Sequence, residues 1–284
     1  MITKVLVTVM TYPTLSEKYF ETVCTAGFRE DGSWIRIFPV PHRLLREQYD
    51  TEAYAKWQWI EADLERNDNH DDRPESYHIA NIDTLRVLQR IDIKGKPNWD
   101  LRQHWVHQNK PIFSNMSDLI QRTKKNELSL AVLKPTKILN MTCEPVDMEK
   151  FSEKLKKLQI KYDAQKNNMF FDKTTLDYNF SFAEKIPYKF RYHFLTEDGQ
   201  ERKIMVEDWE IGQLFRNCLK TSQDVEQAKQ KVVDKYMHMA TTKNLYFFMG
   251  TSYQWQKRKA PDPYLIIGVF CPPKSRNLLI DFEK

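Results

Sequence analysis

The chain has 284 residues, of which 41% are hydrophobic, 29% are charged and 13% are aromatic. This composition is typical of a folded globular protein, and it excludes a disordered or collagen-like chain. The formal net charge of +5 makes the protein mildly basic, which favours an anionic partner without requiring one. No stretch approaches the about 18 apolar residues of a membrane span, so we expect a cytoplasmic protein without a membrane partner.

Several common chemistries lack their sequence signatures. The seven glycines are too far apart for the loops that hold nucleotide phosphates in Rossmann and P-loop proteins. Neither a G-x-S-x-G nucleophile turn nor an H-E-x-x-H zinc helix occurs. The four scattered cysteines form no C-x-x-C pair, so we expect free thiols and no metal site. No cofactor is expected, apart from magnesium if the nuclease alternative below holds.

The first third of the chain is predicted to be mainly β-structure. Residues 3–10 alternate like a strand, and residues 21–28 and 34–40 fit a hairpin joined by the turn sequence Asp31-Gly32. Residues 54–64 favour a strand, with a helix as the open alternative, and residues 76–93 favour another strand. The polar segment 63–75 between them contains a proline and is predicted to be a loop.

Helices are predicted in the middle of the chain. Residues 99–107 and 117–125 have helical patterns, and short strands follow over 128–133 and 137–142. Asp147 can cap a further helix, whose apolar face runs beside a lysine stripe at positions 150, 154, 157 and 161. We interpret the stripe as a solvated face, with phosphate contact as the alternative.

The polar, weakly patterned residues 165–175 follow this helix. We therefore expect an N-terminal β-rich part, residues 1–146, and a C-terminal α+β part, residues 147–284. The C-terminal part is predicted to contain a hairpin over 188–194 and 201–206, two helices over 210–219 and 223–240, and closing strands over 244–249 and 264–270. These elements predict an α+β fold of antiparallel sheets, with barrel-like closure as one option, and flanking helices.

Residues 188–194 carry the most distinctive pattern, because aromatic and basic side chains alternate along the predicted strand. Successive side chains of a strand point to opposite faces. The aromatic side is expected to be core. The other side, formed by Lys189, Arg191 and His193, is a candidate binding face.

Two further segments mix basic and aromatic residues. Trp34 and Arg36 share one face of their predicted strand, and Arg43 follows shortly after it. The long segment 250–263 carries an aromatic residue and three cations: Trp255, Lys257, Arg258 and Lys259. This combination pairs a stacking surface with phosphate-binding groups, although a loop that lysines merely keep solvated would look the same.

We therefore predict a nucleic-acid-binding protein, for DNA or RNA, that uses basic strand faces and this aromatic and basic loop. One alternative is a metal-dependent nuclease or another nucleic-acid-modifying enzyme, with Glu201, Lys203 and Asp208 as candidate catalytic residues. Carboxylates would hold magnesium there, and the lysine would steady the phosphate. The other alternative is a protein-interaction module, in which exposed aromatics such as Trp255 pack against a protein partner.

Overall fold

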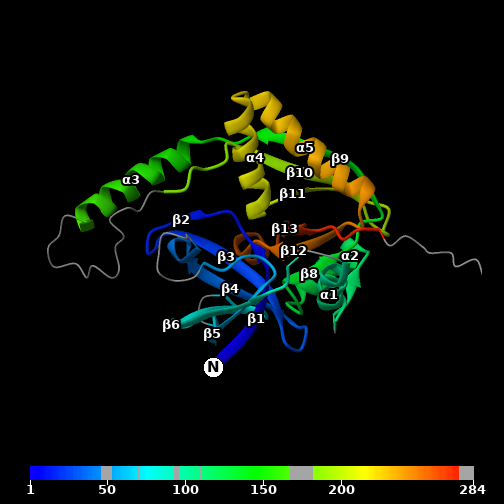
Figure 1. The fold of residues 1–284 in the computed structure, drawn as a ribbon, viewed down its shortest axis with the longest axis horizontal. Coiled ribbons are helices and arrows are strands. Elements are labelled where there is room, and N and C mark those ends of the chain that lie inside the picture. Colours follow the sequence, from blue (N-terminus) through cyan, green and yellow to red (C-terminus); the bar gives the residue numbers. More distant parts are fainter. Residues whose placement is uncertain (46–52, 69–70, 93–95, 109, 167–181, 275–284) are drawn as a thin grey trace, which may run out of the picture.

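The computed structural model describes residues 1–45, 53–68, 71–92, 96–108, 110–166 and 182–274. It confirms the predicted α+β class, because these ranges form largely antiparallel sheets with flanking helices (Figure 1). An N-terminal lobe is built on a six-stranded sheet, and a C-terminal lobe is built on a four-stranded and a three-stranded sheet. The polar stretch predicted at 165–175 lies almost entirely outside the described residues.

The N-terminal sheet closes on itself through strand pairing. Its elements are β1 (Ile2–Met10), β2 (Thr14–Ser16), β3 (Phe20–Arg29), β4 (Trp34–Pro41), the 3-10 helix η1 (His42–Leu45), β5 (Gln58–Arg66) and β6 (Ser76–Arg90). Their order is β1-β5-β6-β4-β3-β2, and an additional β1–β3 pairing completes a ring. All ring pairings are antiparallel except β4–β6, a short parallel step in which Arg36 lies opposite Ser76. The ring is least extensively joined at this step.

Residue alternation along β4 separates the inside of the ring from its outside. Ile35 and Ile37 are at most 1% exposed and pack in the ring interior with Val5, Val7 and Ile60. The intervening side chains of the same strand belong to the outer face. The strand predicted over 54–64 is present as β5, so the helical alternative for it was wrong.

The C-terminal lobe contains two sheets on either side of an aromatic core. The four-stranded sheet has the order β13 (Tyr264–Phe270), β12 (Tyr246–Thr251), β8 (Leu130–Leu133), β7 (Ile112–Phe113), and the three-stranded sheet has the order β11 (Glu201–Met205), β10 (Tyr188–Leu195), β9 (Lys137–Pro145). The helices are α1 (Lys96–His107), α2 (Met116–Lys124), α3 (Glu149–Lys166), α4 (Trp209–Ser222), α5 (Val225–Thr242) and α6 (Tyr253–Lys257). The segment predicted as a loop over 250–263 therefore contains a short helix.

The alternating strand β10 has the core face that its sequence predicts. Phe190, Tyr192 and Phe194 are at most 2% exposed and belong to the cluster that includes Phe215 and Phe247. The Tyr192 hydroxyl donates to the carbonyl oxygen of a residue in α5 at 2.8 Å, so its polar atom is satisfied inside the core. The aromatic side of this strand thus joins the two sheets of the lobe.

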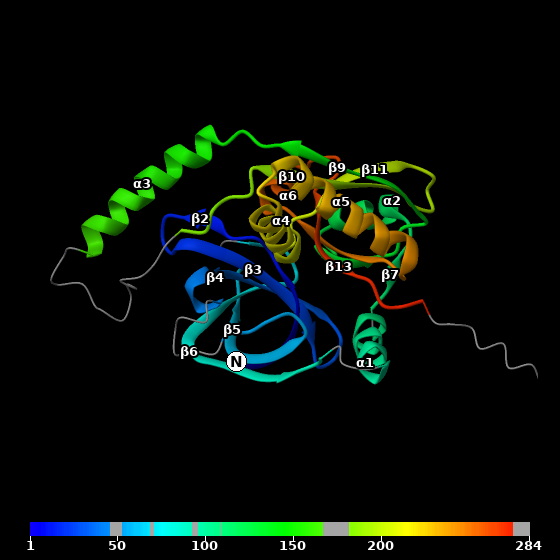
Figure 2. The same cartoon turned by 45° about the horizontal axis from the view of Figure 1, so that its top comes forward.

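Helix α3 extends away from the C-terminal lobe and passes over β2 in both views (Figures 1 and 2). Asp147 accepts a hydrogen bond from the backbone N–H of Glu149, as a capping residue would. Two lysines of the predicted stripe, Lys154 and Lys161, donate to the carbonyl oxygens of Leu15 and Glu17 at 2.9 and 2.8 Å. These two lysines therefore fasten the helix to the N-terminal lobe.

The outer face of β3 and β4 packs against the four-stranded sheet. Phe28 and Trp34 lie in one buried cluster with Phe248 and Ile267. The Trp34 and Phe248 rings are 5.6 Å apart, edge to face. The two lobes consequently share a core along this face.

Candidate functional site

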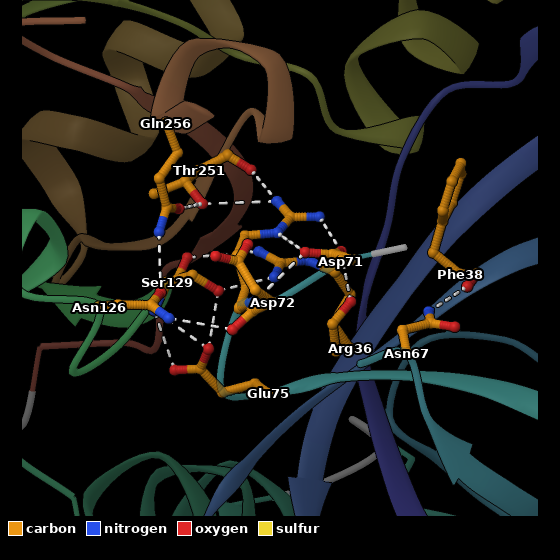
Figure 3. A network of polar contacts seen from close by, with 12 residues as sticks. Arg36, Phe38, Asn67, Asp71, Asp72, Glu75, Asn126, Ser129, Thr251 and Gln256 are labelled. Carbon is orange, nitrogen blue, oxygen red and sulfur yellow. Dashed lines mark hydrogen bonds and ion pairs between the residues drawn. The ribbon is translucent and has the colours of Figure 1, made fainter. Parts of the chain in front are cut away.

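The candidate site lies where three segments meet: residues 71–75 of the loop between β5 and β6, the outer face of β4, and α6 (Figure 3). In the loop, Arg73 forms a buried ion pair with Asp71, from Nε to Oδ1 at 2.7 Å and from Nη2 to Oδ2 at 2.5 Å. The Arg73 Nη1 also donates to the Thr251 carbonyl oxygen at 2.6 Å. Burial raises the pKa of Asp71, but the Arg73 and Ser76 hydrogen bonds outweigh it and lower the pKa overall. The loop is thereby tied to the end of β12.

Arg36 lies beside this ion pair and is only 2% exposed. Its Nη1 donates to the Ser129 hydroxyl at 2.7 Å, and the Glu75 carboxylate accepts the Ser129 hydroxyl proton at 2.7 Å. Burial, followed by repulsion from Arg73, lowers the pKa of Arg36. Two guanidinium groups are thus held close together by a fixed polar network.

Two cavities adjoin this network. One has a volume of about 380 Å³ and the other of about 490 Å³. Phe38, Arg73 and Tyr253 line both, and we call the two together the inter-lobe cleft. Their volumes fall within the range of about 300–1,000 Å³ that is usual for small-molecule sites.

Aromatic and cationic side chains gather at the mouth of the inter-lobe cleft. Phe38 is 37% exposed although it belongs to β4, and Figure 3 shows its ring standing clear of the polar network. The Tyr253 ring has the Arg73 guanidinium 5.4 Å from its centroid and the Lys257 ammonium 5.7 Å from it. Lys18 lines the cleft from the loop before β3. The mouth therefore combines flat rings with positive charge.

Glu207 lines the inner cavity of about 380 Å³. Burial raises the pKa of its carboxyl group from 4.5 to about 7, against the attraction of Lys189. Cys24 lines the same cavity, and burial likewise raises the pKa of its thiol. The inner end of the cleft thus holds an acidic group that is costly to ionise.

The basic face of β10 lies apart from the mouth of the cleft. Arg191 is paired with Glu144 at 3.2 Å, and His193 lies 3.5 Å from Glu201. Lys189 borders a separate cavity of about 300 Å³, which Glu207 also lines from the other side. The structure therefore brings only Lys189 of this face near the cleft.

The other predicted binding residues divide between core and rim. Trp34 is 8% exposed in the core shared by the lobes, and Arg43 lies in η1, with its side chain outside the described part of the chain. Trp255 is 40% exposed on α6. The three cations that follow it, Lys257, Arg258 and Lys259, are also exposed. Lys257 and Lys259 line a separate cavity of about 660 Å³, which meets the inter-lobe cleft at Tyr253, so the segment predicted to bind nucleic acid borders the cleft.

The candidate nuclease residues do not converge. Asp208 is buried, is paired with Lys56 at 2.5 Å, and caps the N-terminus of α4. Lys203 is paired with an acid of β9, and Glu201 faces His193. Across the ranges that the structure describes, no group of three or more His, Cys, Asp or Glu side chains is arranged to hold a metal ion.

Sequence reasoning missed Arg73, Tyr253 and Glu207. Arg73 follows two aspartates in a segment that was predicted only to be a loop, and its partner Thr251 is 178 positions away in the chain. Phe38 carried a usable signal, because it shares its strand face with Trp34 and Arg36. Nothing local to Tyr253 or Glu207 distinguishes either from an ordinary surface residue.

The strand order of the N-terminal ring can be compared with that of a known fold. Its strands in chain order are β1, β3, β4, β5 and β6, and they pair in the order 1-2-3-5-4-1 with the third and fifth parallel. This is the strand order of the OB fold, whose second and third strands and flanking loops form the usual ligand face. Here the outer side of β3 and β4 is largely covered by the four-stranded sheet. The inter-lobe cleft adjoins its remaining part at Arg36 and Phe38, next to residues 71–75, which precede the fifth strand.

The chain belongs to the family of a domain of unknown function, DUF8757, whose model matches residues 112–283. Residues 1–108 match the model of a second domain of unknown function, DUF8758. The two-part division at residues 146 and 147 stays a prediction. No curated protein matches the chain significantly. No helix of the described ranges is both long and apolar enough to cross a membrane.

Proposed function

We propose that this protein binds single-stranded DNA or RNA in the inter-lobe cleft. The observation that carries the proposal is the gathering of Phe38, Tyr253 and several cations around the uncovered end of the face that OB folds use for ligands. OB folds commonly combine a positive groove with aromatic side chains on which bases stack. A shared strand order does not by itself imply a shared function, so the proposal depends on the residues of the cleft.

Stacking would come from the two rings at the mouth. Phe38 is 37% exposed and lies on β4, so a regular element positions it. Tyr253 lies on α6, and its ring already has the cationic groups of Arg73 and Lys257 beside it. A base that stacks on this ring would lie close to both cations. Stacking of one base on an aromatic ring contributes about 1–3 kcal/mol to binding and tolerates any base.

Phosphate contacts would come from the rim. Lys257, Arg258 and Lys259 are exposed at the end of α6 and just after it, and Lys18 lines the cleft from the loop before β3. Arg73 is already neutralised by Asp71, so we expect it to hold the loop in place. Rim cations that are free to meet phosphates make binding strongly salt-dependent.

The nuclease alternative gains no support, since Glu201, Lys203 and Asp208 are engaged in separate ion pairs. The exposed Trp255 keeps a protein partner as a further hypothesis, and the cytoplasmic location also stays a prediction.

The proposal is tested by fluorescence anisotropy with labelled single-stranded oligonucleotides of mixed sequence, between about 50 and 200 mM salt. We expect log Kd to depend linearly on log salt concentration. Changing Lys257, Arg258 and Lys259 together to alanine should lower the slope by about 2, at about 0.7 for each lost phosphate contact.

The matched control changes the same number of exposed lysines elsewhere: Lys220, Lys231 and Lys235 of α4 and α5, all to alanine. This variant loses the same charge but should keep nearly the wild-type slope, because its lysines lie on other elements. If the wild-type protein shows no salt-sensitive binding to DNA or RNA, the proposal is wrong. Equal salt-dependence slopes for the two variants would show that α6 does not contact the phosphates.

A further inference from the structure

Glu207 is firmly placed at the inner end of the inter-lobe cleft. It follows β11, and its backbone N–H donates to the carbonyl oxygen of Ile266 in β13 at 2.8 Å. The preceding residue, Val206, forms a bridge with the same residue. Its side chain lines the cavity of about 380 Å³ together with Arg36, Phe38 and Arg73. A carboxylate on such a fixed backbone can select the group that approaches it.

The Glu207 carboxyl group has no hydrogen-bond donor among the residues that the structure describes. The adjacent Asp208, in contrast, accepts a hydrogen bond from Lys56 and another from the backbone of Glu210. The Glu207 side chain is half-buried, and a partly desolvated carboxylate without donors is costly to ionise. The oxygens of Glu207 are therefore available to a ligand that supplies N–H groups.

We propose that Glu207 binds the Watson–Crick edge of one guanine base of the bound strand, an inference that rests on the function proposed above. An ionised carboxylate is acceptor-only and offers two oxygens side by side. Guanine presents two N–H donors side by side, at N1 and at the 2-amino group. Adenine and cytosine each place an acceptor next to their amino group, and thymine and uracil flank one donor with carbonyl oxygens. Only guanine complements both oxygens.

The other walls of the inner cavity suit the same base. Arg36 and Arg73 line the cavity with their guanidinium groups bonded to Ser129 and Asp71, so they supply a positive field that favours the acceptor edge of guanine. Phe38 lies where the two cavities join and would stack on a base that enters. A base that leaves its strand and enters this cavity would be recognised by hydrogen bonds to its Watson–Crick edge, as in other proteins that bind a single extruded base.

The ionisation of Glu207 gives the interaction a pH dependence. The charged or titratable groups that line its two cavities are Tyr12, Lys185, Tyr188, Lys189, Cys24, Arg36, Arg73, Asp208 and Tyr253. The Glu207 pKa of about 7 means that the acceptor form is a minority below neutral pH and dominates above it. Guanine binding should therefore strengthen as the pH rises through about 7.

The test compares oligothymidylate with the same oligonucleotide carrying one central guanine, adenine, cytosine or hypoxanthine, by fluorescence anisotropy. We expect the guanine oligonucleotide to bind at least about 10-fold more tightly at pH 8, which one good bidentate contact would supply. Hypoxanthine lacks the 2-amino group and should lose most of this gain. The preference should shrink at pH 6.

Glu207→Gln should abolish the guanine preference, while the control Glu153→Gln, on an exposed carboxylate of α3, should retain it. Thermal unfolding of each variant establishes that it is folded. Salt-sensitive binding with equal affinity for all five oligonucleotides would overturn the guanine site and leave the proposed function intact. Absence of binding to any oligonucleotide would overturn both.

Discussion

Replacing Glu207 with glutamine removes a carboxyl group whose ionisation opposes folding. Its pKa is about 7 in the folded protein and ordinarily 4.5, so between these values the folded protein retains a proton that the unfolded chain has released. The stability that comes from this proton is fully present below pH 4.5 and is lost as the pH rises to about 7. At about 1.4 kcal/mol per pKa unit, the interval corresponds to about 3 kcal/mol.

The assay is urea unfolding of the wild-type protein and of Glu207→Gln at several pH values between about 4 and 8. The free energies of unfolding of the two proteins are compared at each pH. Glutamine does not ionise, so the stability of the variant minus that of the wild type should grow by about 3 kcal/mol across this range. The control is Glu153→Gln, which removes one charge from an exposed site and should show no comparable growth. A difference that stays constant from pH 4 to pH 8 would refute the reasoning.

Three further predictions concern the supports and the mouth of the cleft. Asp71→Ala leaves the Arg73 guanidinium buried without its carboxylate and should destabilise the protein by about 3–5 kcal/mol in urea unfolding, whereas a loss below about 1 kcal/mol would mean that the pair is solvated. Lys56→Met leaves the Asp208 carboxylate buried without its cation and should lower the free energy of unfolding by a similar amount at pH 7. Because burial raises the pKa of Asp208, this loss of stability should diminish in acid, and a larger loss in acid would contradict the prediction. Phe38→Ala should weaken oligonucleotide binding by about 1–3 kcal/mol without changing its salt slope, measured by fluorescence anisotropy, and a changed slope would show that Phe38 does not act by stacking.

Local pattern was sufficient to predict the strand β10 and its core face. Alternation with period two sends Phe190 and Tyr192 to the same side whatever else the chain does, and that side is buried. The opposite side was predicted to be a cationic face. Its neutralising acid, Glu144, comes from β9, whose register against β10 is set by tertiary pairing. Charge along one strand therefore says little about the charge of the assembled face.

The same limit applies to the cleft. The outward direction of Trp34 and Arg36 followed from the pleat, but whether that face meets solvent or another sheet depends on Phe248, more than two hundred residues later. The exposed position of Trp255 was predictable from its polar neighbours. That its segment would lie beside residues 71–75 was not, because the contact is made by Arg73 with Thr251 and Tyr253, which are distant in the chain.

The most direct test of nucleic-acid binding in the inter-lobe cleft is photocross-linking of an oligonucleotide that contains 5-iodouracil, followed by mass spectrometry of the attached peptides. This base reacts with aromatic side chains on which it stacks. We predict cross-links at Phe38 and at Tyr253, lost on competition with unlabelled oligonucleotide. Cross-links confined to β10, or none above a control protein, would contradict the account.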